Sequence, residues 1–123
     1  MKPTVLVIED DLGTRASLVD LFAEEGYRVL SAEHGTQALE ILADETTNLI
    51  VTDLGMPVMN GWQLLSRLKR RPELRGIPIV VFSADFRPNG ISTEIPILKK
   101  PEDLGRLLAV VRASLERVTK CAA

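Results

Sequence analysis

The residues best suited to chemistry are acids that stand directly after apolar runs of the sequence. Asp53 follows the apolar run 49–52, and turn-forming residues, among them Pro57 and Gly61, come after it. This pattern predicts a buried strand that ends at Asp53, followed by a loop and a helix. In open α/β sheets, ligands bind just beyond the carboxyl ends of the strands. Asp53 therefore stands where chemistry is expected.

Polar residues also end three other predicted strands. The first strand, 4–8, runs into Glu9 and Asp10, the fourth, 77–82, ends at Ser83, and the fifth, 95–98, ends at a pair of lysines, Lys99 and Lys100. A parallel sheet places the carboxyl ends of all its strands on one edge. Residues that are far apart in the sequence are therefore expected to converge there on Asp53.

The elements between these residues support a parallel sheet. Strands are predicted at 4–8, 27–32, 48–53, 77–82 and 95–98. The expected helices start at about 12, 35, 60 and 104, and the first shows an apolar spacing of Leu12, Ala16, Val19, Phe22 and Ala23, with Gly26 at its end. Alternation of strands and helices implies an α/β fold in three layers, with helices on both faces of a five-stranded parallel sheet.

One crossover is irregular. The segment 84–94, between the fourth and fifth strands, has only eleven residues and contains Pro88, Asn89 and Gly90. A crossover needs about a dozen residues including its helix, and these residue types disfavour a helix interior. The fourth helix is therefore predicted to be missing or shortened to about one turn.

The converging residues suit a metal-assisted phosphoryl transfer. Three carboxylates held close together repel one another unless a cation neutralises them, and hard oxygen ligands suit Mg²⁺. We expect Glu9, Asp10 and Asp53 to hold one divalent ion, whereas Asp11 is assigned to capping the first helix. Asp53 can also act as a nucleophile, and Lys100 and the Ser83 hydroxyl can offset charge on a phosphoryl group.

This constellation closely resembles the receiver domain of two-component response regulators. The resemblance rests on Glu9-Asp10, Asp53 with Met56-Pro57 and Asn60-Gly61, Ser83-Ala84 and Lys100-Pro101, and it covers essentially the whole chain, 1–123, as one domain. It implies a doubly wound sheet of order 2-1-3-4-5. It also implies that Asp53 accepts a phosphoryl group from the phosphohistidine of a histidine kinase or phosphotransfer protein. The backbone carbonyl of Gly55 would join the Mg²⁺ ligands, Ser83 would be the switch hydroxyl and Lys100 the phosphoryl contact.

Two departures from the family pattern support an alternative function. Ile97 stands where receivers usually carry an aromatic residue, and the segment 84–94 is short. The alternative is an interaction module that keeps the fold but works without phosphorylation. A Mg²⁺-dependent phosphatase is disfavoured, because such enzymes place the nucleophile after the first strand with a second Asp two residues on, where this chain has Gly55.

The composition of the chain limits the kinds of binding partner that it is expected to have. The chain has 123 residues, is 46% hydrophobic and carries a net charge of −2, which gives no general signal for nucleic acid or membrane binding. The basic run 67–75 is interpreted as a solvated face and His34 as a surface turn residue. The one cysteine, Cys121, fits a reducing, cytoplasmic compartment, and signalling is expected through a downstream protein.

Overall fold

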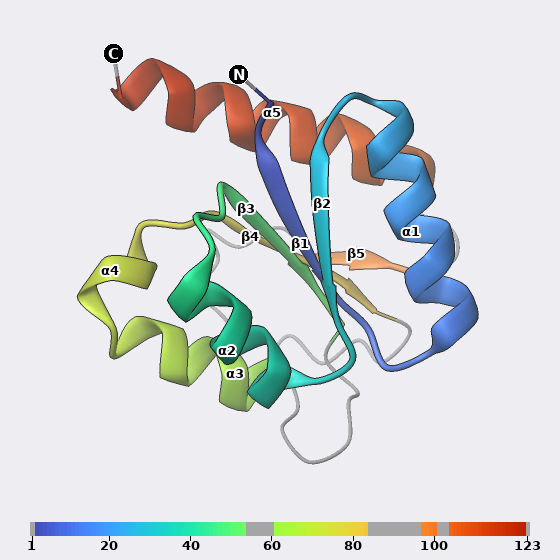
Figure 1. Cartoon of the computed structure of the whole chain (residues 1–123). Helices are drawn as coiled ribbons and strands as arrows, with labels where there is room; N and C mark the ends of the chain where they lie inside the picture. The colour runs from blue at the N-terminus through green and yellow to red at the C-terminus, as the bar shows by residue number, and fades with distance from the viewer. Residues whose placement is uncertain (1, 54–60, 84–96, 101–103, 123) are drawn as a thin grey trace.

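The chain alternates strands and helices around a central sheet (Figure 1). The computed structural model describes residues 2–53, 61–83, 97–100 and 104–122. In chain order the elements are β1 (Thr4–Ile8), α1 (Leu12–Glu24), β2 (Arg28–Ala32), α2 (Gly35–Asp44), β3 (Leu49–Thr52), α3 (Gly61–Lys69), α4 (Pro72–Arg75), β4 (Ile79–Ser83), β5 (Ile97–Lys99) and α5 (Leu104–Ala122).

All five strands are parallel and lie in the order β2-β1-β3-β4-β5. The order reverses direction between β1 and β3, where Val5 pairs with Leu49 and Ile8 with Thr52. The predicted α/β class and the strand order are both confirmed. Because the chain leaves β1 and β3 at adjacent points of one sheet edge, the residues that follow these two strands must lie side by side.

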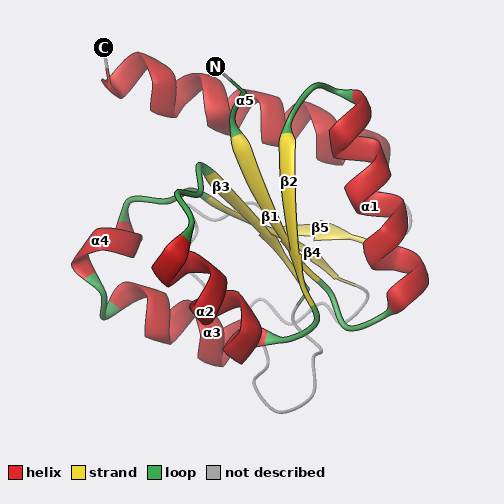
Figure 2. Ribbon diagram, viewed as in Figure 1, coloured by secondary structure: helices red, strands yellow, loops and turns green. Residues whose placement is uncertain are grey.

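Helices cover both faces of the sheet, as Figure 2 shows, and each face has its own apolar cluster. Alternate strand residues point to opposite faces, so that Val5 and Val7 pack with α1 and α5 while Leu6 and Ile8 pack with α2 and α3. All five residues of β1 are buried. This two-sided burial explains why the central strands are continuous apolar runs rather than alternating ones.

Gly26 ends α1 as predicted. Its φ of 92° lies in the left-handed region that glycine adopts without steric cost. The Gly26 amide donates to the Ala23 carbonyl at 3.0 Å, and the Tyr27 amide donates to the Phe22 carbonyl at 3.2 Å. This pair of bonds is a Schellman motif, which satisfies two carbonyls at the helix end and turns the chain into β2.

Two details differ from the sequence-based expectation. The predicted apolar face of α1 is wrong in part, because Leu12 is 70% exposed and the buried residues are Leu18 and Phe22. The helix expected to start at about 60 is confirmed as α3, but a second helix directly after it was not predicted. Pro72 starts the separate short helix α4, and Arg71 before it is extended, at φ −105° and ψ 110°, as proline requires of its predecessor.

The crossover helix between β4 and β5, which the sequence predicts to be missing or shortened, falls in the segment 84–94. That segment lies outside the described residues. No helix within the described part of the chain is long and apolar enough to cross a membrane.

His34 has a structural role that the sequence interpretation missed. The residue is half-buried and caps α2, with its Nδ1 accepting a hydrogen bond from the Gln37 amide at 3.1 Å. We expect His34→Ala to lower the free energy of unfolding by about 1 kcal/mol, because an amide at the helix start loses its acceptor. Urea unfolding measures this loss. His34→Asn, which keeps a capping acceptor, is the control, and an equal loss in both variants would contradict the capping role.

Candidate functional site

The site lies at the edge of the sheet where the carboxyl ends of the strands meet. After β1, β3 and β5, one backbone hydrogen bond beyond the strand holds the next residue in place. The Glu9 amide donates to the Ala32 carbonyl at 3.0 Å, the Asp53 amide to the Ile8 carbonyl at 3.1 Å and the Lys100 amide to the Ser83 carbonyl at 3.1 Å. Each bond continues the ladder of the strand before it. The backbones of three chemically active residues are therefore held by hydrogen bonds to the sheet itself.

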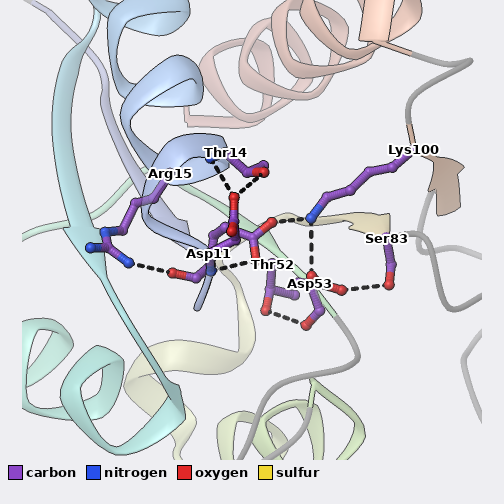
Figure 3. A network of polar contacts seen from close by, with 8 residues as sticks. Asp11, Thr14, Arg15, Thr52, Asp53, Ser83 and Lys100 are labelled. Atoms are coloured by element: carbon purple, nitrogen blue, oxygen red, sulfur yellow. Dashed lines mark hydrogen bonds and ion pairs between the residues drawn. The ribbon is translucent and has the colours of Figure 1, made fainter.

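Lys100 joins two carboxylates of the site, the buried Glu9 and the half-buried Asp53 (Figure 3). Its Nζ donates to Asp53 Oδ2 at 3.0 Å and also forms an ion pair with Glu9 Oε1. The Glu9 side chain is only 2% exposed and that of Asp53 12%. The ammonium also lies 5.8 Å from the centre of the Phe82 ring, within cation–π range. Lys100 thus supplies positive charge where two carboxylates would otherwise repel each other.

Ser83 contacts the Asp53 carboxylate at a different oxygen from Lys100, as the dashed lines in Figure 3 show. The Ser83 hydroxyl is buried and donates to Asp53 Oδ1 at 2.5 Å. The two oxygens of Asp53 therefore have different partners, a neutral hydroxyl on Oδ1 and a cation on Oδ2. A carboxylate held in this way has a fixed orientation.

Three carboxylates form the only cluster of metal-binding type found among the described residues. Glu9, Asp10 and Asp53 each offer an oxygen, and these oxygens lie within 4.8 Å of one another. Glu9 is buried, Asp53 is half-buried and Asp10 is exposed. A set of hard oxygen donors that is open to solvent on one side suits a divalent ion that keeps part of its water shell, as Mg²⁺ does.

The loop between β1 and α1 is fixed by the first turn of the helix. Asp11 caps α1 as predicted, with Oδ2 accepting from the Thr14 amide at 2.8 Å and from the Thr14 hydroxyl at 2.7 Å. These hydrogen bonds lower the pKa of Asp11. Arg15, from the same turn, donates to the backbone carbonyl of Glu9 at 2.9 Å. Asp11 therefore caps α1, whereas Glu9 and Asp10 belong to the acidic cluster.

Burial and charge shift the pKa values of the site. Burial raises the pKa of Glu9 from its ordinary 4.5 to about 7; Lys100 works against this rise and the Asp53 carboxylate adds to it. Burial acts to lower the pKa of Lys100, but its bonds to Glu9 and Asp53 outweigh burial and raise it. Lys100 is therefore charged at neutral pH, whereas Glu9 exchanges its proton near pH 7.

Glu9 should make the stability of the metal-free protein depend on pH. Its pKa is higher in the folded chain than in the unfolded one, so the folded state binds the proton more tightly. The resulting stabilisation is complete below about pH 4.5 and is lost as the pH rises through about 7. Urea unfolding between pH 5 and 8 measures it. Glu9→Gln, which cannot ionise, should lack this component, and identical pH profiles for the two proteins would contradict the assignment.

The structure brings together most of the residues singled out from the sequence. Glu9, Asp10, Asp53, Ser83 and Lys100 lie at one edge, while Gly55, the proposed carbonyl ligand, lies outside the described residues. The contact of Lys100 with Glu9 and the role of Arg15 were not predicted. Arg15 stands one turn after the capping Asp11, and that spacing was the available signal.

Comparison with known proteins agrees with the fold. Residues 5–112 match the model of the response regulator receiver domain. The chain is 36% identical over 119 residues to two-component response regulator ORR6 of Oryza sativa subsp. japonica, covering 88% of this chain and 70% of that protein. It is 35% identical over 115 residues to ORR3 of Oryza sativa subsp. indica, covering 86% and 88%.

Solved structures show the same architecture. The crystal structure of a response regulator receiver protein from Pseudomonas putida superposes with a TM-score of 0.83 at 27% identity, and the match covers 92% of this chain and 98% of that one. The family match extends from β1 into α5 and so includes every residue of the site described above. The chain belongs to the response regulator receiver domain family of two-component signalling.

Proposed function

We propose that residues 1–123 form a single receiver domain that accepts a phosphoryl group on Asp53 with the help of Mg²⁺. The observation that carries this proposal is the arrangement around Asp53. One carboxylate oxygen accepts from Ser83, the other pairs with Lys100, and the acids Glu9 and Asp10 lie alongside. A carboxylate that served only as a turn acid would need none of these partners.

The donor set fits the proposed ion. Glu9, Asp10 and Asp53 would hold Mg²⁺, together with the backbone carbonyl of Gly55. When bound, the ion offsets negative charge on phosphoryl oxygens. An acidic set of this kind also favours a cation because the three carboxylates repel one another without one.

Each side chain has a distinct task in the proposed transfer. An oxygen of Asp53 forms a bond to phosphorus while the phosphorus–nitrogen bond of a phosphohistidine breaks, and the departing imidazole recovers its electron pair and binds a proton. Lys100 is fixed beside Asp53 and presents its charge to the incoming phosphoryl oxygens. The Ser83 hydroxyl exchanges its bond to Asp53 Oδ1 for a bond to a phosphoryl oxygen.

The family implies a histidine kinase or a histidine phosphotransfer protein as the phosphoryl donor. The proposed output is a change of surface that a downstream protein reads by direct contact in the cytoplasm, without direct binding to nucleic acid or membrane. The net charge of −2 is consistent with a protein partner rather than an anionic one.

Intact mass measurement tests the proposal. The chain is incubated with a phosphorylated phosphotransfer protein, or with phosphoramidate, in the presence of Mg²⁺ or of EDTA. We expect the mass of one phosphoryl group to be gained with Mg²⁺ and not with EDTA, and to be lost again in hydroxylamine, which cleaves acyl phosphates. If the chain gains no mass under any of these conditions, the proposal fails and an interaction module independent of phosphorylation is the better assignment.

A further inference from the structure

We propose that Arg15 is a positioning residue for the metal ligands. The inference rests on the proposed function, because it assigns Arg15 the task of fixing the peptide that joins Glu9 to Asp10. Its guanidinium Nη1 donates to the Glu9 carbonyl oxygen at 2.9 Å. That carbonyl belongs to the peptide between two proposed ligands, so a rotation of this peptide would redirect both carboxylates.

A second contact holds the guanidinium in place. Arg15 Nη2 lies 3.5 Å from Oε1 of Glu33, which directly follows β2, and the Arg15 side chain is only 13% exposed. The planar guanidinium presents several donors in fixed directions, so it can bind both acceptors at once. Arg15 thereby connects the first turn of α1 to the residues that follow β1 and β2, and Figure 3 shows it reaching back from the helix.

Two other groups of this loop are fixed independently of the Arg15 side chain. The Glu9 amide donates to the Ala32 carbonyl, and the Asp11 carboxylate accepts from Thr14. The Glu9 carbonyl is a further point of control, and the Arg15 side chain donates to it. Groups that orient metal ligands in this way typically contribute about 10- to 100-fold to metal affinity.

Charge and positioning predict opposite outcomes when Arg15 is removed. A cation near an acidic cluster opposes the binding of Mg²⁺, so deleting its charge should tighten binding if only the charge matters. If Arg15 instead fixes the Glu9 carbonyl, deleting it should weaken binding. A role confined to fold stability would change the melting temperature and leave the affinity unaltered well below that temperature.

Calorimetric titration of the whole chain with MgCl₂ separates these outcomes. We expect Arg15→Met to weaken Mg²⁺ binding about tenfold relative to wild type. The matched control is Arg28→Met, which removes the same charge from an exposed ion pair with Glu45 and should leave the affinity within about twofold. Unchanged or tighter binding by Arg15→Met would overturn the inference.

A conservative variant keeps the test decisive if Arg15→Met fails to fold. Arg15→Lys retains the charge, but its single nitrogen replaces a fork that reaches both the Glu9 carbonyl and Glu33. We expect Arg15→Lys to bind Mg²⁺ about threefold more weakly than wild type, short of the loss in Arg15→Met. Wild-type affinity in Arg15→Lys would overturn the inference.

A measurement on the metal-free chain distinguishes failure of this inference from failure of the proposed function. Amide hydrogen exchange and NMR line widths at Asp10 and Asp11 report the order of the loop without any ion. We expect faster exchange or broader lines at both amides in Arg15→Met, with Arg28→Met like wild type. If wild type binds no Mg²⁺, the proposed function fails but the amides still test Arg15, and unchanged amides would overturn its role.

Discussion

Asp53→Asn is expected to abolish phosphoryl uptake completely. The substitution keeps the size and planarity of the side chain but replaces the nucleophilic carboxylate with an amide, which cannot form the acyl phosphate. It also removes the charge that pairs with Lys100 and one of the three carboxylates of the acidic cluster. Intact mass measurement after incubation with phosphoramidate and Mg²⁺ should show wild type gaining one phosphoryl group and Asp53→Asn gaining none.

Asp11→Asn is the matched control for this experiment. Asp11 is an acid of the same type near the site, but it caps α1 through Thr14 and lies outside the acidic cluster. Asparagine is an equally good capping residue, so the helix start should be preserved. We expect Asp11→Asn to gain a phosphoryl group at the wild-type level. Modification of Asp53→Asn would place the phosphoryl group on another residue and refute the role assigned to Asp53.

The convergence of the site residues was predictable because it follows from topology. Once the strands are known to be parallel, the residues that end β1, β3, β4 and β5 must share an edge, whatever the details of packing. Glu9, Asp53, Ser83 and Lys100 obey this rule, and three of them are fixed by a backbone hydrogen bond that continues a strand. The bond from Asp53 to Ile8 exists because β3 pairs with β1 in parallel register.

Side-chain partners were harder to predict, because they depend on geometry rather than on order along the chain. Leu12 is apolar by type, yet it is 70% exposed in the first turn of α1, and the buried contacts of that helix are made by Leu18 and Phe22. His34 is a rare capping residue, so its type gave little signal for the start of α2. Arg15 had only its spacing from Asp11 as a signal, because its importance comes from the carbonyl that it reaches.

The expected effects of Lys100→Met on metal binding and on phosphoryl transfer have opposite signs. Lys100 pairs with Glu9 and Asp53, both proposed as Mg²⁺ ligands, so removing its charge should tighten Mg²⁺ binding at least about tenfold. The same charge is proposed to stabilise the phosphoryl oxygens during transfer. Its loss should slow phosphorylation by phosphoramidate on the order of a hundredfold or more. Calorimetry and time-resolved mass measurement give the two quantities.

Lys99→Met is the control, because it removes the same charge from the neighbouring residue, which has no role in the proposed site. It should change neither the Mg²⁺ affinity nor the phosphorylation rate by more than about twofold. If Lys100→Met lost Mg²⁺ affinity and transfer rate together, the ammonium would be supporting the metal site rather than the phosphoryl group. If it kept the wild-type rate, Lys100 would serve only to neutralise the charges of Glu9 and Asp53. The opposite signs are thus the specific signature of a lysine that the carboxylates hold in place for the phosphoryl group.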